Sequence, residues 1–330
     1  MTQAAEPLLD VRNLSVSFGG SDGDTVTAVD DVSFTVTAGR TLGLVGESGS
    51  GKSVTSLAIM QLLPKGAAKV SGSVMLEGRD LLAAKDAEMR DLRGNTLAMI
   101  FQEPMTSLNP AYRIGDQVAE ALIRHQGLSK SEARRRAIDL LRLVRIPSPE
   151  RRSQDFPHKL SGGQRQRVMI AMALACGPKV LIADEPTTAL DVTIQAQILY
   201  LMRQLKEETG AAVILITHDL GVVAEVCDDV AVMYAGEVVE RAPVADLFAF
   251  PQHPYTVGLL GSLPKFDQKS ARLPVIAGTV PDPRALPSGC RFRARCPFAI
   301  EKCKEAPPLL QLSENRASRC WRAPLEEIAA

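Results

Sequence analysis

Four short apolar runs constrain the fold most strongly, because each one ends at a residue of evident chemical use. They are Leu42–Val45 before Gly46, Ala98–Phe101 before Gln102, Val180–Ala183 before Asp184, and Val213–Thr217 before His218. Continuous apolar runs of this length are typical of strands buried on both faces of a parallel sheet. Ligands of such sheets bind beyond the carboxyl ends of the strands. The sequence therefore predicts an α/β fold in which the four polar residues surround one site.

The bulk properties of the chain favour two domains and argue against nucleic acid as the main partner. The chain has 330 residues, and a domain takes about 150. Its 38 basic and 38 acidic side chains give a formal net charge of zero, whereas proteins that hold a polyanion usually carry a basic excess. No secretory signal is visible, and no apolar run approaches the roughly 20 residues that span a bilayer. We therefore expect a cytoplasmic chain that acts at a membrane only through a partner.

Hydrophobic periodicity predicts strands at the start of the chain and a helix near residue 130. Apolar and polar residues alternate over 14–18, 32–36 and 74–76, and a Gly- and Asp-rich loop is expected over 18–31. Ser129 and Glu132 have the spacing of a capping box and precede an apolar helix face that reaches Val144. From about residue 264 the composition shifts toward Pro, Arg and Cys, which indicates a separate C-terminal module.

The segment Gly46–Ser53 reads G-E-S-G-S-G-K-S and matches the phosphate-binding pattern G-x-x-x-x-G-K-S/T. Its glycines let backbone N–H groups turn toward phosphate oxygens without side-chain clash. A helix expected to run through Leu63 presents its N-terminus to the same anion. Lys52 supplies a charge for the β- and γ-phosphates, and the Ser53 hydroxyl is a ligand for Mg²⁺. The predicted nucleotide-binding residues of this phosphate loop are Gly46, Ser48, Gly49, Ser50, Gly51, Lys52 and Ser53.

Two acidic residues close the third of the apolar runs. In proteins with a phosphate loop, the acid at the end of this strand holds Mg²⁺, which assigns that role to Asp184. Glu185 follows directly and is placed to accept a proton from an attacking water. We therefore expect Glu185 to be the catalytic base.

The segment Leu160–Gln164, L-S-G-G-Q, identifies the branch of phosphate-loop proteins. It resembles the signature sequence of ATP-binding-cassette ATPases, and Ser161 lies 19 residues before Val180, where that family has it. Its chemistry is that of a helix N-terminus, with Ser161 as the cap and an apolar-rich helix that continues to Ala175. The resemblance implies that the partner cassette's ATP contacts Ser161, Gly162, Gly163 and Gln164.

Other positions resemble functional residues of the same family. Gln102 resembles the glutamine that contacts Mg²⁺ and the attacking water and that senses the transmembrane partner. His218 resembles the histidine that contacts the γ-phosphate, and Thr188–Asp191 resembles the loop that crosses the dimer interface, with Asp191 at the nucleotide. Phe18 falls where the family places an aromatic side chain on adenine, although it also fits a strand core.

Three longer segments resemble the dipeptide/oligopeptide permease subfamily of these ATPases. They are Ile100–Pro110, Asp184–Gln195 and His253–Thr256. The resemblance implies a cassette over residues 1–252 and a C-terminal extension over 253–330. The expected fold is an α/β phosphate-loop cassette with a mostly parallel core sheet, an antiparallel β subdomain and a helical subdomain at about 104–176. A small, loop-rich, metal-binding C-terminal module completes it.

The resemblance also implies a mechanism and partners. Two cassettes close head to tail on ATP and open after hydrolysis, which drives peptide import. The expected partners are a second homologous ATPase subunit, two transmembrane permease subunits and, indirectly, an extracytoplasmic peptide-binding protein. The expected location is peripheral, on the cytoplasmic face of the inner membrane. The same subunit type serving a metal or another small solute, and a soluble cassette ATPase of DNA repair or translation, are the alternatives.

Four of the six cysteines gather in the last tenth of the chain, at Cys290, Cys296, Cys303 and Cys320. A tetrahedral set of four sulfurs suits zinc or an iron–sulfur cluster, and the close C-x₂₋₄-C pair of zinc sites is missing. The resembled permease ATPases carry a 4Fe–4S cluster at matching cysteines, which favours that cluster here, with zinc as the alternative. The role is expected to be structural, and a redox-regulatory role is the other hypothesis.

Overall fold

The computed structural model describes residues 6–19, 25–103, 107–187, 192–263 and 276–325, and it divides into two compact units. Unit 1 comprises Met1–Leu9, Val36–Arg40 and Ala83–Ile216. Unit 2 comprises Asp10–Thr35, Thr41–Leu82 and Thr217–Ala330. No described helix is both long enough and apolar enough to cross a membrane.

Unit 1 contains three parallel strands, in the order β6 (Leu97–Ile100), β7 (Val180–Asp184) and β8 (Ala212–Thr217). Every residue of the three strands is buried. Burial on both faces is what an unbroken apolar run predicts, so these three of the four runs are confirmed as core strands, except that Phe101 lies beyond β6 and is exposed. Their carboxyl ends deliver Gln102 and Asp184 to the same edge of unit 1.

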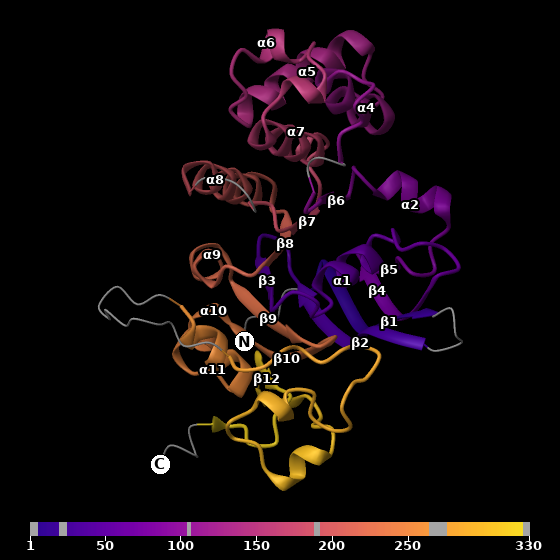
Figure 1. Ribbon diagram of the computed structural model, residues 1–330. Helices are drawn as coiled ribbons and strands as arrows, with labels where there is room; N and C mark the ends of the chain where they lie inside the picture. Colours follow the sequence, from indigo (N-terminus) through magenta and orange to yellow (C-terminus); the bar gives the residue numbers. More distant parts are fainter. Residues whose placement is uncertain (1–5, 20–24, 104–106, 188–191, 264–275, 326–330) are drawn as a thin grey trace. The chain divides into compact units, whose positions relative to one another are not determined.

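The helices of unit 1 include a bundle formed by α4, α5 and α7 (Figure 1). The helices are α2 (Asp86–Leu92), α4 (Ile114–Gln126), α5 (Lys130–Leu143), α6 (Pro149–Arg152), α7 (Gly162–Leu174) and α8 (Val192–Thr209), with a 3₁₀ turn at Pro157–Lys159. The predicted capping box begins α5, since the Ser129 hydroxyl accepts from the Glu132 N–H and the Glu132 carboxylate accepts from the Ser129 N–H.

Unit 2 contains a four-stranded sheet in the order β2-β1-β4-β5. The strands are β1 (Leu9–Gly19), β2 (Thr25–Val36), β4 (Ala68–Leu76) and β5 (Arg79–Asp80), and β5 pairs antiparallel with β4. The alternating residues Leu14, Val16, Phe34 and Val36 are buried as their period predicts. The loop expected up to Asp31 is shorter, because the β-branched residues from Thr25 onward already belong to β2.

A second set of strands in unit 2 lies in the order β3-β9-β10-β12-β11. The strands are β3 (Thr41–Val45), β9 (Asp229–Tyr234), β10 (Glu237–Pro243), β12 (Arg316–Ser318) and β11 (Leu310–Ser313). β3 contains the apolar run Leu42–Val45 and pairs parallel with β9. The remaining neighbours pair antiparallel. The C-terminal module therefore contributes two strands to this sheet, which the sequence analysis did not predict.

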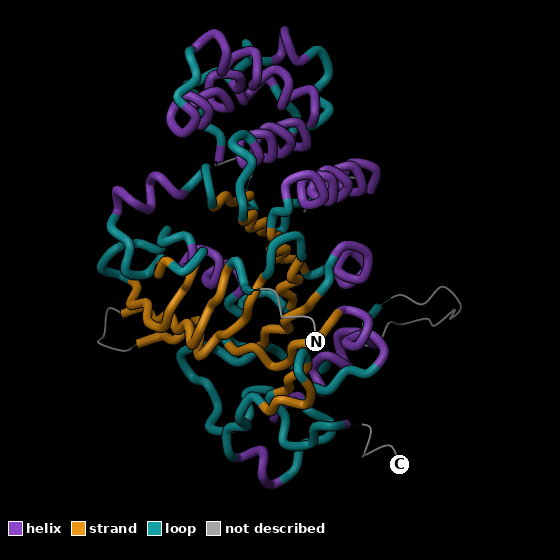
Figure 2. Tube along the Cα trace, turned by 180° about the vertical axis from the view of Figure 1, so that it is seen from behind, coloured by secondary structure: helices purple, strands orange, loops and turns teal. Residues whose placement is uncertain are grey.

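The helices of unit 2 are short, and the C-terminal module consists mainly of loops (Figure 2). The helices are α1 (Lys52–Ile59), α9 (Leu220–Val226), α10 (Val244–Ala249) and α11 (Pro254–Gly261), with 3₁₀ turns at Arg293–Arg295 and Glu301–Lys304. The helix after the phosphate loop ends at Ile59 and does not reach Leu63, because Gln61 adopts a φ of 48°. The loop-rich character of the C-terminal module agrees with its content of proline.

Candidate functional site

The phosphate loop makes a tight turn between β3 and α1 that only glycine can form at two positions. Gly46 has a φ of 152°, and a Cβ there would collide with the carbonyl oxygen of Met233. Gly51 is the N-cap of α1 with a φ of 100°, and its Cβ would lie 2.7 Å from the Ala28 carbonyl oxygen. The backbone of the loop therefore packs closely against the backbone at Met233 and Ala28. Ser48 and Gly49 are exposed, and a Cβ at Gly49 would meet no neighbouring atom within 4 Å.

Lys52 is buried and curls back over the phosphate loop. Its ammonium group donates hydrogen bonds to the carbonyl oxygens of Gly46 at 2.8 Å and Glu47 at 2.9 Å, and to the Ser50 hydroxyl at 3.3 Å. A buried ammonium held this way, at the N-terminal end of an eight-residue helix, forms a fixed positive site that suits a phosphate. Ser53, the predicted Mg²⁺ ligand, is half-buried in the first turn of the same helix.

Glu47, the second residue of the phosphate loop, is held by two side chains of the C-terminal module. Its backbone N–H donates to the Tyr255 hydroxyl at 2.8 Å. Its carboxylate accepts two hydrogen bonds from the Arg295 guanidinium, at 2.6 and 3.0 Å. These partners lie 208 and 248 residues further along the chain, so no local pattern could indicate them. The sequence analysis assigned neither Glu47 nor Arg295 to the nucleotide site.

In unit 1, the predicted base and the predicted water-contacting glutamine lie side by side. The Gln102 side-chain amide donates to the Glu185 carboxylate at 3.0 Å. Glu185 directly follows buried Asp184 and has a φ of 47°, and its N–H donates to the Ile216 carbonyl at 2.9 Å. A left-handed conformation is unusual for a glutamate and is often found at functional sites. The arrangement provides a carboxylate that can accept a proton beside an amide that can orient water.

The predicted signature forms the N-terminus of α7. The Ser161 hydroxyl accepts from the Gln164 N–H at 3.3 Å, and the Gln164 side-chain oxygen accepts from the Ser161 N–H at 3.2 Å. This is a complete capping box. Ser161 and Gly162 are exposed, so the positive end of the helix faces outward.

Phe18 and His218 also belong to the predicted nucleotide residues. His218 is exposed just after β8, and Phe18 is half-buried near the end of β1. Asp191 and the rest of Thr188–Asp191 lie outside the described residues.

The four C-terminal cysteines line one pocket, which we call the cysteine pocket. Its walls also include aromatic side chains of Phe292, Phe298 and Trp321. All four sulfurs are free thiols, and burial raises the pKa of the Cys290 thiol to about 11. Within the part of the chain that the structure describes, no group of three or more His, Cys, Asp or Glu side chains is arranged to hold a metal ion. The expected metal-binding character of the module is therefore not confirmed.

Two family models match the chain. The model described as "ABC transporter" matches residues 29–188. The model described as "Oligopeptide/dipeptide transporter, C-terminal region" matches residues 239–303. The first match includes the phosphate loop, the signature and the acidic pair, and the second includes Tyr255, Arg295 and three of the four clustered cysteines.

Curated proteins and solved structures resemble the chain over most of its length. The oligopeptide transport ATP-binding protein OppD of Salmonella typhimurium is 51% identical over 99% of this chain and 98% of its own. A probable peptide ABC transporter ATP-binding protein of Sinorhizobium fredii is 55% identical over 97% of this chain and 96% of its own. The ATP-binding cassette MJ0796, solved as a dimer in a post-hydrolysis state with ADP and Pi, is 28% identical with a TM-score of 0.64. That match covers 72% of this chain and 98% of the cassette.

Proposed function

Because this chain belongs to the ABC transporter family of ATPases, with the C-terminal region of oligopeptide/dipeptide transporters, we propose that it powers the import of short peptides. The observation that carries the proposal is the presence of both regions in one chain. Relatives named as peptide or oligopeptide transport subunits align with this chain almost end to end. The chain itself is an ATPase.

The nucleotide site is proposed to consist of the phosphate loop and the residues that hold Mg²⁺. Lys52 binds the β- and γ-phosphates with the backbone N–H groups of the phosphate loop, and Ser53 and Asp184 hold Mg²⁺. The buried lysine and the crowded glycines of the loop support this assignment. Phe18 packs on adenine, which suits its half-buried place on β1.

Hydrolysis is proposed to depend on Glu185 as the base. Its carboxylate takes the proton of the attacking water, while Gln102, 3.0 Å away, orients that water. His218 contacts the γ-phosphate. Because hydrolysis removes the γ-phosphate, it also removes the group that holds two cassettes together.

The family resemblance supports a proposal for the wider assembly. We propose a cassette over 1–252, with its helical subdomain at about 104–176, and a C-terminal extension over 253–330. Ser161, Gly162, Gly163 and Gln164, together with Asp191, act on the ATP of a second, homologous cassette. The pair associates with two permease subunits on the cytoplasmic face of the inner membrane, and an extracytoplasmic binding protein delivers the peptide.

Uptake by cells tests the proposal. Deleting the gene is expected to abolish uptake of radiolabelled di- and tetrapeptides, and a plasmid copy of the wild-type gene is expected to restore it. A copy that carries Glu185→Gln is expected to fail. Unchanged peptide uptake in the deletion strain, with loss of uptake of a metal or another nutrient, would support the same subunit type with a different solute.

For the cysteine pocket we propose a 4Fe–4S cluster with a structural role, and zinc is the alternative ligand. The convergence of four thiols on one pocket supports this proposal. Of the five basic side chains in the surrounding segment, Arg291, Arg295 and Lys304 form ion pairs with Asp30, Glu47 and Glu301, so they offset little of a thiolate charge. A bound cluster would supply the bonds that cross-link this loop-rich segment.

Anaerobic purification followed by analysis of iron, acid-labile sulfide and zinc tests the cluster. About four irons and four sulfides per chain, lost in Cys296→Ser, would support it. One zinc per chain would replace the cluster with a zinc site. A folded, active preparation with neither metal would leave the four cysteines as thiols and refute both.

A further inference from the structure

Arg295 uses every N–H donor of its guanidinium, and two of them bind Glu47 of the phosphate loop. Its side chain is 5% exposed, and its two Nη atoms donate to the two oxygens of Glu47. Three further hydrogen bonds go to the carbonyls of Ala277 at 2.9 Å and Ile276 at 3.2 Å, and to the Tyr234 hydroxyl at 3.4 Å. A guanidinium has five N–H donors, and all five are used here.

The environment of this ion pair makes it sensitive to replacement. The Arg295 guanidinium lies 5.7 Å from the centre of the Tyr234 ring and 6.0 Å from that of Phe292. The Glu47 carboxylate, its principal partner, raises the pKa of Arg295 above its usual value. Removing Arg295 leaves the Glu47 side chain, which is 31% exposed, without its paired charge. Because Glu47 belongs to the phosphate loop, the cost of that loss falls on the loop.

A second arginine supports the phosphate loop from another direction. Arg291 donates to the Ala235 carbonyl at 2.6 Å and forms an ion pair with Asp30. The next residue in that turn, Gly236, donates its N–H to the Ser50 carbonyl at 3.0 Å. Arg291 thus holds the turn that contacts the phosphate loop at Ser50, while Arg295 holds the loop at Glu47.

Both arginines lie within the short segment between Cys290 and Cys296. The two cysteines line the cysteine pocket, and the Cys290 N–H donates to the Cys303 carbonyl at 3.0 Å. The segment is therefore anchored at the pocket, while its side chains reach the phosphate loop. No residue of the segment belongs to the sequence motifs of the nucleotide site.

We propose that the segment Cys290–Cys296 is a brace for the phosphate loop, with Arg295 as a positioning residue that sets the affinity for ATP through Glu47. The inference rests on the proposed role of the phosphate loop in ATP binding. It assigns to the C-terminal module a function in the nucleotide site of its own chain. The brace acts on the ground-state conformation of the loop and leaves the hydrolytic groups of unit 1 untouched.

Titration of the purified full-length chain with a fluorescent ATP analogue tests the brace, together with steady-state ATPase kinetics. Arg295→Met keeps the aliphatic stem and removes the ion pair, and we expect it to weaken binding about tenfold, the worth of one strong charged hydrogen bond. KM for ATP is expected to rise by a similar factor, with kcat at saturating ATP within about twofold of wild type. Glu47→Gln is expected to weaken binding similarly, and the double variant no further than either single one.

The matched control is Arg293→Met, because Arg293 lies on the same 3₁₀ turn and makes no side-chain hydrogen bond to a described residue. It is expected to bind ATP as wild type does. Arg295→Lys keeps the charge and loses the bidentate contact with the carboxylate, so it replaces the methionine variant if that variant does not fold. We expect its ATP affinity to lie between those of wild type and Arg295→Met.

Two outcomes overturn the brace: wild-type ATP affinity in a folded Arg295 variant, or additive losses in the Glu47 and Arg295 double variant. Lys52→Ala separates this failure from failure of the phosphate site itself. If Lys52→Ala loses ATP binding while the Arg295 variants keep it, the phosphate site stands and the brace is wrong. If Lys52→Ala binds ATP normally, the phosphate site is wrong.

Discussion

At the scale of single residues, the geometry of Glu185 is the most informative feature of unit 1. Its φ of 47° turns the backbone away from the strand, directly after Asp184. Two neighbours fix this conformation: the Ile216 carbonyl accepts its N–H, and the Gln102 amide contacts its carboxylate. A half-buried carboxylate held in an unfavourable backbone region by specific partners suits a catalytic base.

Replacing Glu185 with glutamine removes the base and preserves the shape of the site. The new amide oxygen can still accept from Gln102, so we expect ATP binding to stay unchanged. Turnover is expected to fall by about 10²- to 10⁴-fold, the usual contribution of general base catalysis. Single-turnover hydrolysis with radiolabelled ATP measures this effect, and normal hydrolysis by Glu185→Gln would exclude Glu185 as the base.

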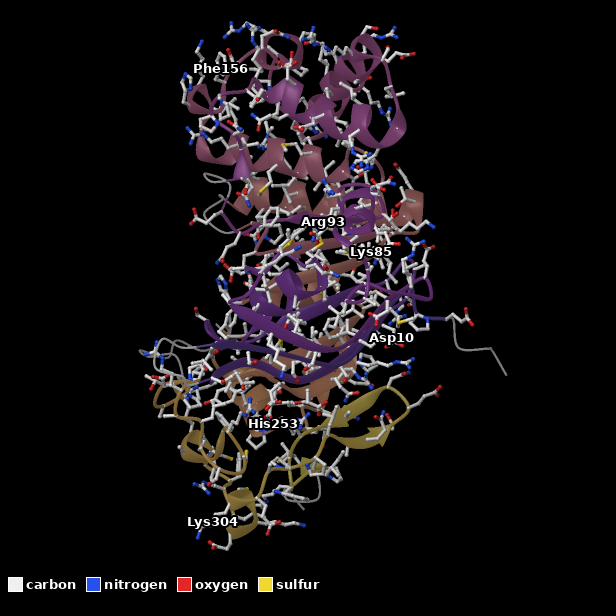
Figure 3. The ribbon with its side chains drawn as sticks, turned by 90° about the vertical axis from the view of Figure 1, so that its right-hand side faces the viewer. Asp10, Lys85, Arg93, Phe156, His253 and Lys304 are labelled. Atoms are coloured by element: carbon white, nitrogen blue, oxygen red, sulfur yellow. The ribbon has the colours of Figure 1, made fainter. Side chains whose placement is uncertain are left out.

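Two buried titratable groups beside the start of α11 have pKa values that are shifted in opposite directions. The Glu240 carboxylate accepts from the N–H groups of Gln252 at 2.6 Å and His253 at 2.9 Å. Burial raises the pKa of Glu240 to about 7, against the opposing effect of these two N–H groups and of Arg316. Burial lowers the pKa of His253, labelled in Figure 3, to about 3. The His253 Nδ1 accepts from the Tyr255 N–H at 3.1 Å, which requires a ring without a proton on Nδ1.

These shifts predict opposing effects of pH on stability. The folded chain holds the Glu240 proton more tightly than the unfolded chain does, so this group's contribution to the free energy of unfolding falls as the pH rises from 4.5 to about 7. The unfolded chain binds the His253 proton more tightly, so that contribution falls as the pH drops from 6.5 toward about 3. Between pH 4.5 and 6.5 the two slopes largely offset each other.

Replacing Glu240 with glutamine removes the effect of this carboxyl on the pH dependence of stability and leaves the effect of His253. On lowering the pH from 7 to 4.5, we expect the stability of wild type relative to Glu240→Gln to rise by up to about 3 kcal/mol. Urea unfolding at several pH values measures the difference. A difference that does not vary with pH would mean that Glu240 has an ordinary pKa in the folded chain.

At the scale of elements, contiguous patterns could be predicted and remote pairings could not. The four apolar runs became buried strands except for Phe101, and the predicted capping box at Ser129 and the predicted cap at Ser161 each begin a helix. The end of α1 was predicted too late, because no residue type marks the left-handed turn at Gln61. β12 was missed because Ser318 pairs with Glu240 across a long stretch of sequence, and three residues carry little periodicity.

The two capping boxes of unit 1 provide a matched test of the signature. Ser129 and Ser161 each accept from the N–H three residues on, at 3.3 Å in both cases. Replacement with alanine is expected to cost about 1 kcal/mol of stability at either helix. ATPase activity is expected to fall only in Ser161→Ala, since only that helix N-terminus is proposed to meet ATP. Equal turnover in the two variants, measured as phosphate release, would reduce Ser161 to an ordinary cap.

At the scale of the whole molecule, the chain joins a nucleotide cassette to a module that the sequence presents as separate. The cysteines, the compositional shift and the subfamily resemblance all indicated a distinct C-terminal part. The ion pair between Glu47 and Arg295 ties that part to the phosphate loop within unit 2. Such a contact forms only when the complete chain folds. The local motifs therefore predicted the chemistry of the site, and they did not predict the side chains of Arg295 and Tyr255 that hold Glu47.

Peptide-dependent ATP hydrolysis by the reconstituted transporter tests whether the chain powers peptide import. The chain would be assembled in lipid vesicles with its homologous ATPase subunit and permease subunits, and phosphate release followed with and without peptide-loaded binding protein. We expect the loaded binding protein to increase ATP hydrolysis, and we expect Glu185→Gln to remove this increase. Hydrolysis that stays the same with and without peptide, in vesicles where another solute increases it, would contradict peptide import as the function.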